Sequence, residues 1–522
     1  MTTAEIFTAV LVIVFFAVMI GVGLYCRKHS TNVDGFVLGG RSVGPWLTAF
    51  AYGTSYFSAV IFVGYAGQFG WAFGVASTWI GLGNAFIGSL LAWVILGRRT
   101  RIMTQHLNSK TMPDFFQKRF GSDGLKIAAA CIVFVFMIPY TASLYNGLSS
   151  LFNIAFEIPY WVCILAMAIL TGIYVIFGGY MATAINDFIQ GIIMLAGIAA
   201  VVLAVLNQNG GLMGSFEALA NAEEGGWQFT SFFGPNPLFL VFVVLLTSLG
   251  TWGLPQMIGK FYAIKNEAAI RKGTLISTIF AIIVAGGCYF LGGFGRLFLT
   301  QEEVSAKGFD SIVPTMLSNL SPIIIGIVIV LVLSASMSTL SSLVLTSSST
   351  LTLDVIAPAS KKGFTEKKKI TWMRLLIVFF ILLSALIAIL KDSIWKDFVF
   401  IAQMMGVSWG AMAGAFLAPF LYGLYWKKVT RPAVWTSFVF GVGLMCVQLM
   451  VSMKVIAFDG GVLGFIFTNS LYSGVFAMLG GLILVPIVSL LTKKKIPEGV
   501  DQMFSCYKTE NTVPATSSLQ EK

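Results

Sequence analysis

Residues 51–60 read AYGTSYFSAV and lie between PWLTAF and IFVGYAG, in a stretch apolar enough to enter a membrane. Glycine and small hydroxyl residues at mid-span let a helix unwind, which frees backbone carbonyls and amides. These groups are costly in hydrocarbon unless they line a polar cavity. Freed carbonyls suit a hard cation, and freed amides suit a carboxylate. The stretch predicts a broken helix at a transport site, although a kink or a small-residue packing face is the plainer alternative.

The composition supports a membrane setting for this stretch. The chain is 57% hydrophobic and only 11% charged, whereas soluble domains carry about 25% charged residues. The charges cluster between apolar runs long enough to cross a bilayer. We therefore expect a multi-pass protein of the plasma membrane, with the lipid bilayer as a partner.

The charged and metal-binding residue types exclude several functions. The net charge of +11 lies in loops that flank spans, where the positive-inside bias explains it, so we expect no nucleic-acid partner. Both histidines, His29 and His106, fall in basic loops, which argues against a histidine-metal centre. No acidic pair or histidine lies at membrane depth, so we expect no enzyme activity.

The apolar runs predict an all-α membrane protein with about thirteen transmembrane helices. The first run is too long for the apolar core of a signal peptide, so we interpret it as a retained span. The predicted spans centre on residues 6–25, 45–64, 75–97, 126–150, 157–178, 185–206, 236–259, 273–295, 322–347, 372–390, 397–424, 432–451 and 465–491.

The distribution of lysine and arginine predicts the orientation of these spans. With the N-terminus outside and the C-terminus inside, all but five of the 33 basic residues fall in cytoplasmic segments, and Lys260 is counted there. The five exceptions are Arg296, Lys307, Lys391, Lys396 and Lys454. We assign residues 1–492 to one transmembrane domain and residues 493–522 to a polar cytoplasmic tail, which we expect to be disordered.

A second interrupted span follows the first at a regular interval. The seventh span carries SLGTWGLPQ at 248–256, with two glycines, a proline and a threonine. Spans two to six and seven to eleven then form two sets of five, at about 45–206 and 236–424. An odd number of spans places the two copies in opposite orientations. Paired broken helices in inverted halves are the best sequence indication of a transport site.

The ninth span is unusually rich in hydroxyl groups. It reads VLSASMSTLSSLVLTSSSTLTLD at 332–354, and Ser338, Ser341 and Ser342 share one helix face. Oxygen donors of this kind fit an alkali cation and offer nothing to zinc or copper. Asp187, at the start of the sixth span, is the clearest acid near membrane depth. It is either a functional residue or a helix-start carboxylate that stabilises its own helix.

Five motifs together resemble a known family. They are GGRSVGPWLTAFAYGTSYFSA (39–59), TMPDFFQKRF (111–120), IFGGYMATAINDFIQG (176–191), GTWGLPQMIGKF (250–261) and LSASMSTLSSLVLTSSSTLTLDV (333–355). With them the chain resembles the sodium:solute symporters from about residue 8 to 490, especially the sodium/proline and sodium/pantothenate branches. The resemblance implies a LeuT-like fold of two inverted five-helix repeats, with extra helices at 6–25, 432–451 and 465–491.

The resemblance also implies a sodium site between the second and ninth spans. Its expected ligands are the carbonyls of Thr54, Phe57 and Ala335 and the hydroxyls of Ser338 and Thr339. Whether one or two sodium ions bind stays open. A second would take Asp187, Ser341 and Ser342 together with Ser338.

The solute is expected to lie beside this cation. The broken spans should contact it, and Tyr140 matches a tyrosine of the family's substrate region. Tyr56 and Thr247 stand where the sodium/proline branch has aspartate and tryptophan, so proline specificity is not implied. The expected contacts are Ser55, Tyr56, Ser58, Tyr140, Thr247, Thr251, Trp252 and Gln403.

The sequence therefore predicts sodium-coupled import of a small organic solute by alternating access. An amino acid such as proline, or a carboxylate such as pantothenate or a monocarboxylate, fits the resemblance. A transporter-like sensor without net transport is the alternative. The roughly 29 residues after Lys493 are too few for a signalling kinase domain, which favours the transporter.

Overall fold

The computed structural model describes residues 3–156, 159–318, 320–360, 363–393 and 401–507. Across these residues the secondary structure is helical, apart from one isolated bridge between Val43 and Ile264. The predicted span starts at 157 and 397, Lys396, and the tail beyond Tyr507 lie outside the described residues.

The α-helices are named in two groups, those before and those after the loop that follows Ala263. The first group is α1 (Thr3–Cys26), α2 (Val33–Leu38), α3 (Pro45–Tyr56), α4 (Ala66–Phe73), α5 (Thr78–Gly83), α6 (Arg98–His106), α7 (Met112–Phe120), α8 (Asp123–Phe156), α9 (Tyr160–Asn207), α10 (Gly211–Asn221), α11 (Trp227–Thr230), α12 (Pro237–Leu249) and α13 (Pro255–Ala263). The second is α14 (Glu267–Ala281), α15 (Gly287–Gly292), α16 (Gln301–Lys307), α17 (Ile312–Ser318), α18 (Pro322–Leu351), α19 (Ala357–Ala359), α20 (Glu366–Ser393), α21 (Ile401–Tyr425), α22 (Arg431–Ser452), α23 (Gly461–Phe467), α24 (Ser470–Leu491) and α25 (Val500–Ser505).

Shorter helical segments join several of these helices. The π-helical segments are η3 (Val60–Tyr65), η5 (Asn84–Leu91), η6 (Trp93–Gly97), η8 (Ile282–Gly286) and η11 (Thr352–Ile356). The 3₁₀ segments are η1 (Arg27–His29), η2 (Gly39–Arg41), η4 (Gly74–Ser77), η7 (Gly250–Gly253), η9 (Gly295–Leu297), η10 (Phe309–Ser311) and η12 (Lys493–Lys495).

Ten helices of the described residues are long and apolar enough to cross a membrane, and the bent α12–α13 pair makes eleven. Two of the ten, Val60–His106 and Trp161–Asn207, have 47 residues each. A helix of that length would measure about 70 Å, against a hydrocarbon core of about 30 Å. Left-handed glycines, Gly74 and Gly179, divide them. Counting each as two spans restores the thirteen predicted.

Both predicted breaks are present. The first broken helix stops at Tyr56, and Phe57 adopts an extended conformation with φ −87° and ψ 117° before η3 begins. The second passes from α12 through η7 to Leu254, with φ −88° and ψ 118°, and bends by 48° into α13. Pro255 begins α13, where its missing N–H costs no hydrogen bond. Nearly equal dihedrals at the two breaks fit a pair of related half-structures.

The glycine in the first broken helix has a role different from the expected one. Gly53 lies inside α3 rather than at the break. A Cβ atom there would lie 2.4 Å from the ring of Phe280, so the glycine admits that aromatic ring against the helix. The chain unwinds four residues later, at Phe57 and Ser58. The sequence located the break within a run of glycine and hydroxyl residues, and of these Ser58 lies at the break whereas Gly53 does not.

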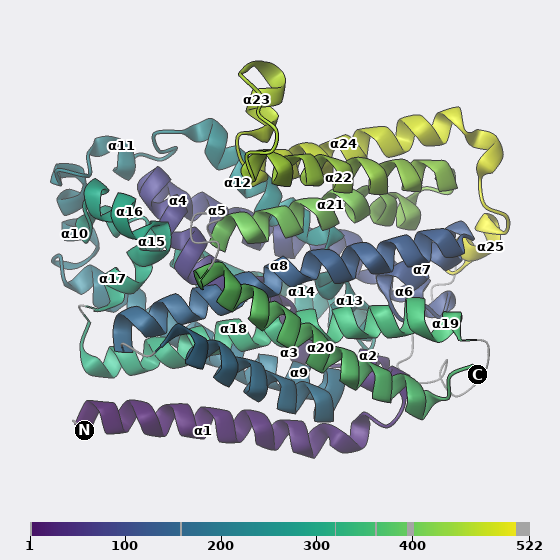
Figure 1. Cartoon of the computed structure of the whole chain (residues 1–522), viewed down its shortest axis with the longest axis horizontal. Helices are drawn as coiled ribbons and strands as arrows, with labels where there is room; N and C mark the ends of the chain where they lie inside the picture. Colours follow the sequence, from purple (N-terminus) through teal and green to yellow (C-terminus); the bar gives the residue numbers. More distant parts are fainter. Residues whose placement is uncertain (1–2, 157–158, 319, 361–362, 394–400, 508–522) are drawn as a thin grey trace.

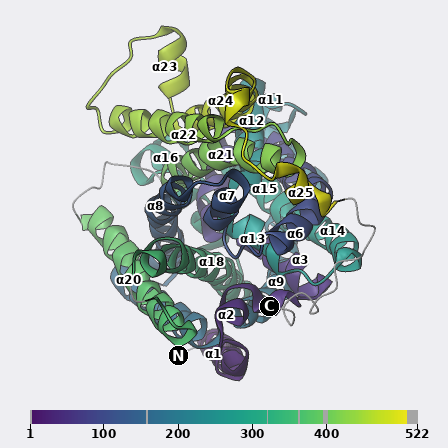
Figure 2. The ribbon, with the colours of Figure 1, turned by 90° about the vertical axis from the view of Figure 1, so that its right-hand side faces the viewer.

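Helix α18 forms the centre of the molecule (Figures 1 and 2). It packs against α9, α8, α1, α20 and α3, and 78% of its most apolar window is buried, compared with 17% for α1. Helices α21, α22 and α24 pack together on the opposite side from α1 (Figure 1). A hydroxyl-rich span in this central position faces protein on all sides and not lipid.

The basic segments gather at one end of the molecule. In Figure 1, α6 and α7, which carry several arginines and lysines, lie at the right together with α19 and α25, and α10, α11 and α16 lie at the left. This arrangement fits the predicted orientation, with the right-hand end in the cytoplasm.

The start of the tail is ordered, which corrects the expectation that it is disordered. Val500 and Phe504 on α25 are buried. The Arg119 guanidinium lies 5.1 Å from the centre of the Phe504 ring, and the Tyr507 hydroxyl donates to the Arg99 carbonyl at 3.2 Å. Burial lowers the pKa of Arg119 to about 10. The expectation of disorder was based on the average polarity of the tail, which does not reveal individual apolar residues such as Val500 and Phe504.

Candidate functional site

Five oxygen atoms converge where the first break meets α18. The Ser338 hydroxyl lies 3.2 Å from the carbonyl oxygens of both Thr54 and Ala335. The Thr339 hydroxyl lies 3.2 Å from the same two carbonyls and 3.4 Å from that of Phe57. The structure thus brings together all five residues predicted for the first sodium site.

The chemistry of this cluster suits a monovalent hard cation. In the described arrangement the two hydroxyls lie within hydrogen-bond distance of the three carbonyls, and each can donate its single hydrogen to one of them. A hydroxyl also carries two acceptor lone pairs, so a rotation of each O–H bond points all five oxygens at a shared cation. The five residues are buried, and the donors are neutral oxygens. Carbonyl rings of this kind replace the hydration shell of an alkali ion.

The residues predicted for a second sodium surround a lysine. Lys260 Nζ lies 3.0 Å from Ser342 Oγ and 3.6 Å from Asp187 Oδ2. Ser342 Oγ is also 2.8 Å from Ser55 Oγ. Ser341 turns back into its own helix and donates to the Ser338 carbonyl at 2.9 Å. Asp187 and Ser342 are therefore brought together, whereas Ser341 points elsewhere.

Lys260 itself was placed wrongly by sequence reasoning. It was counted as a cytoplasmic loop residue, but it lies inside α13 with 3% of its side chain exposed. Pro255 restarts a helix after the break, and that helix carries Lys260 inward against α9 and α18. A helix-starting proline five residues before the lysine was the available sequence signal.

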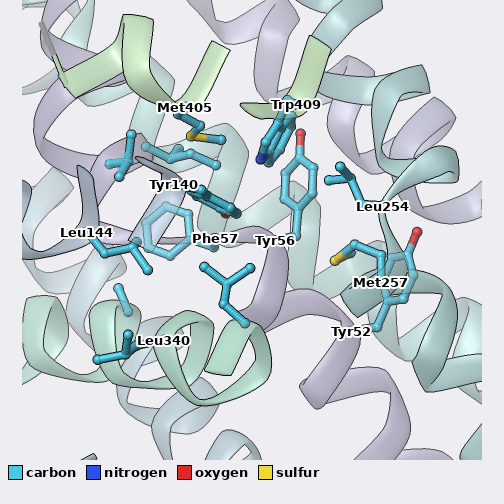
Figure 3. Close-up of a cluster of buried hydrophobic side chains, with 14 of the residues drawn as sticks. Tyr52, Tyr56, Phe57, Tyr140, Leu144, Leu254, Met257, Leu340, Met405 and Trp409 are labelled. Atoms are coloured by element: carbon cyan, nitrogen blue, oxygen red, sulfur yellow. The ribbon is translucent and has the colours of Figure 1, made fainter. Parts of the chain in front are cut away.

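An aromatic cluster lies next to the first break (Figure 3). The Trp409 ring on α21 is centred 6.0 Å from the rings of both Tyr56 and Tyr140. The polar atoms of Trp409, Tyr140 and Ser58 are buried, and the Tyr140 hydroxyl lies near enough to Trp409 and Ser58 to interact with both. A small group of polar atoms that face one another next to a cation cluster is suited to a polar ligand, because buried polar groups need partners.

Trp409 was missed because an aromatic residue in a largely apolar helix gives no directional signal. In α21 the residues before and after it are buried as well, so no polar face indicates which side faces the site. Tyr56, Ser58 and Tyr140, by contrast, were predicted and lie together.

The other residues expected to contact solute make their described contacts elsewhere. Ser55 faces Ser342, as described above. On the second broken helix, Trp252 donates to the Ile87 carbonyl on η5 at 3.0 Å. The Thr247 and Thr251 hydroxyls lie 2.8 Å from the carbonyls of Val243 and Ser248, and 3.1 and 3.5 Å from groups on η5. The described contact of Gln403 is its carbonyl, 3.5 Å from the hydroxyl of Ser470 on α24.

One further contact joins the two broken helices. The Tyr56 hydroxyl donates to the Thr247 carbonyl at 2.8 Å. This bond links the end of α3 to α12, one turn before its break. The two broken helices are therefore hydrogen-bonded to each other in this structure.

A small cavity leads from the basic end of the molecule to Lys260. Its volume is about 50 Å³, and it is lined by Lys110 and Thr111 near that end and by Lys260 and Ser342 at depth. Gln256 lines it too, and neither polar atom of its side chain has a hydrogen-bond partner among the described residues. The cavity gives the lysine cluster a polar connection toward the predicted cytoplasmic side.

A family model for the sodium:solute symporter family matches residues 36–441. The chain belongs to the sodium:solute symporter family. Its similarity to a sodium/proline symporter of Staphylococcus aureus strain RF122 is 29% identity over 496 residues, which covers 93% of each chain. The same similarity is found for the sodium/proline symporter of strain JH9. Membership supports sodium-coupled solute import across the plasma membrane.

Solved structures of transporters share the fold of this family member. A Na⁺-coupled sialic acid symporter superposes with a TM-score of 0.71 at 16% identity, covering 93% of this chain and 98% of that one. MhsT in complex with L-phenylalanine gives 0.52 at 13% identity, covering 86% and 98%. MHP1, a nucleobase-cation-symport-1 family transporter, gives 0.50 at 14% identity, covering 90% and 98%. These likenesses confirm the LeuT-like fold expected from the sequence.

Proposed function

We propose that this symporter binds sodium between the first broken helix and α18, and uses it to import a small carboxylate or amino acid. The convergence of the Thr54, Phe57 and Ala335 carbonyls with the Ser338 and Thr339 hydroxyls carries the proposal. A cation there fixes the unwound backbone, because it attracts the freed carbonyls more strongly than the two hydroxyls do in a low-dielectric interior.

The solute class follows from the neighbouring aromatic cluster. Trp409, Tyr140 and Ser58 offer three hydrogen-bond donors within apolar walls that include Phe57 and Met405 (Figure 3). An indole N–H can only donate, so a ligand that supplies an acceptor fits Trp409. A carboxylate supplies several acceptor lone pairs, and the adjacent sodium supplies the opposite charge. The relatives named sodium/proline symporter are consistent with an amino acid.

Coupling arises because the two ligands share one segment of backbone. Phe57 provides a sodium-directed carbonyl, and the next residue, Ser58, provides a hydroxyl for the solute. Sodium binding orders this pair and raises solute affinity, and linkage requires that the solute raise sodium affinity equally. Rocking of one group of helices against the rest then exposes the loaded site to the cytoplasm.

The proposal is tested by uptake into proteoliposomes that contain the purified protein. L-proline, other amino acids, pantothenate and short monocarboxylates are presented under an inward gradient of sodium, potassium or choline. A labelled solute that accumulates only with sodium supports the proposal. Accumulation of equal size with potassium or choline contradicts sodium coupling. Accumulation of uncharged solutes alone contradicts the carboxylate site.

A further inference from the structure

We propose that the ammonium of Lys260 is a permanent, tethered cation in the place where a second sodium would bind, so that this symporter binds a single sodium ion. The inference rests on the proposed function, because it sets how many ions that transport cycle uses. It comes from the contacts of Lys260 and proposes an answer to the choice between one ion and two that the sequence left open.

The position of the ammonium group carries the first step. Lys260 Nζ approaches Ser342 Oγ at 3.0 Å and Asp187 Oδ2 at 3.6 Å, and it lies 5.3 Å from the centre of the Tyr180 ring. A hydroxyl oxygen, a carboxylate and the face of an aromatic ring each attract a cation. These are the surroundings expected of a bound ion, and a side chain already provides that ion.

Because Asp187 and Lys260 are both buried, their charges have to compensate each other. Asp187 is fully buried and Lys260 is 3% exposed. Buried charges are tolerated when they are paired, and an uncompensated charge is expelled or finds a partner. With Lys260 in place the pair is neutral. A sodium ion added beside Asp187 would meet the ammonium at close range, where the low dielectric strengthens repulsion.

The tethered cation is connected to the first sodium site. Ser342, which Lys260 contacts, also bonds Ser55 at 2.8 Å, and the residue before Ser55 is Thr54, whose carbonyl faces Ser338 and Thr339. Lys260 thereby braces α13 against α18, α9 and α3. A mobile ion would leave this place during the cycle, whereas a lysine stays and carries no charge across the membrane.

The test counts the sodium ions that bind to purified protein, with ²²Na⁺ as the probe and no solute present. We expect one ion per wild-type chain and a Hill coefficient of about 1. Lys260→Gln leaves the Asp187 carboxylate without its cation, so we expect two ions and a Hill coefficient that rises toward 2. The matched control Lys265→Gln removes a lysine five residues further on, and should bind one ion.

Three results separate the claims. Two ions on the wild-type chain, or one ion on well-folded Lys260→Gln, overturn the tethered cation. No saturable sodium binding by the wild-type chain contradicts the proposed sodium site itself. If Lys260→Gln does not fold, the double variant Asp187→Asn, Lys260→Gln keeps the cluster neutral and should bind one ion, and the wild-type count still decides between one ion and two.

Discussion

Replacing Thr339 with valine removes one oxygen from the proposed sodium site and keeps the shape of the side chain. Its hydroxyl lies 3.2 Å from the Thr54 and Ala335 carbonyls and 3.4 Å from that of Phe57, so it occupies the middle of the cluster. Losing one polar contact to a charged group costs about 1.5–3 kcal/mol. At about 1.4 kcal/mol per factor of ten, the sodium dissociation constant should rise about 10- to 150-fold.

The assay is the thermal unfolding midpoint of the purified protein as sodium is increased at constant ionic strength, because a ligand that binds the folded state raises that midpoint. The curve for Thr339→Val should shift to higher sodium by this factor. Ser336→Ala is the matched control: its hydroxyl is buried on the same helix but bonds the Val332 carbonyl at 2.8 Å. A shift for Ser336→Ala equal to that of Thr339→Val, or no shift for Thr339→Val, would refute the reasoning.

Four further outcomes are expected. Trp409→Phe removes an indole donor from the solute cluster, so the KM for solute should rise several-fold while sodium binding without solute stays unchanged. Tyr56→Phe loses the hydrogen bond between the two broken helices, worth about 0.5–1.5 kcal/mol, and should slow uptake at saturating sodium; uptake at the wild-type rate would count against coupling through this bond. Asp187→Asn leaves the ammonium of Lys260 unpaired and should cost about 3–5 kcal/mol of stability, seen as a lower melting temperature, with the sodium Hill coefficient unchanged. Phe504→Ala should lower the melting temperature by detaching α25 and leave the sodium midpoint unaltered, and a shifted midpoint would show that the tail reaches the transport site.

Local sequence signals and the family resemblance together located the cluster of five oxygens. A run such as GTSYFS favours a break at a polar site, and hydroxyls spaced three and four residues apart share a helix face, which groups Ser338 with Ser341 and Ser342. Ala335 and Thr339 came from the resemblance, and the structure places them with Ser338 against the first break. The count of thirteen spans could be predicted because the thickness of the bilayer fixes the length of a span.

The lysine cluster and the aromatic cluster depended on information that the sequence does not hold locally. The predicted seventh span ends at residue 259, which places Lys260 in the following loop, whereas the helix that Pro255 starts continues to Ala263 and buries it. Trp409 lies on a helix buried on every side, where periodicity carries no direction. Thr251 and Trp252 are on the broken helix as expected, but the rotation of that helix turns them toward η5. Packing between helices decides how each helix is rotated and how far it continues, and a local stretch of sequence does not show that packing.

The most direct measurement is ²²Na⁺ binding by the purified wild-type protein and by the double variant Ser338→Ala, Thr339→Ala, with Ser336→Ala as control. The wild-type protein and the control should bind sodium saturably with the same affinity, and the double variant should lose saturable binding while remaining folded. Sodium binding by the folded double variant at wild-type affinity would contradict a sodium site between the first broken helix and α18.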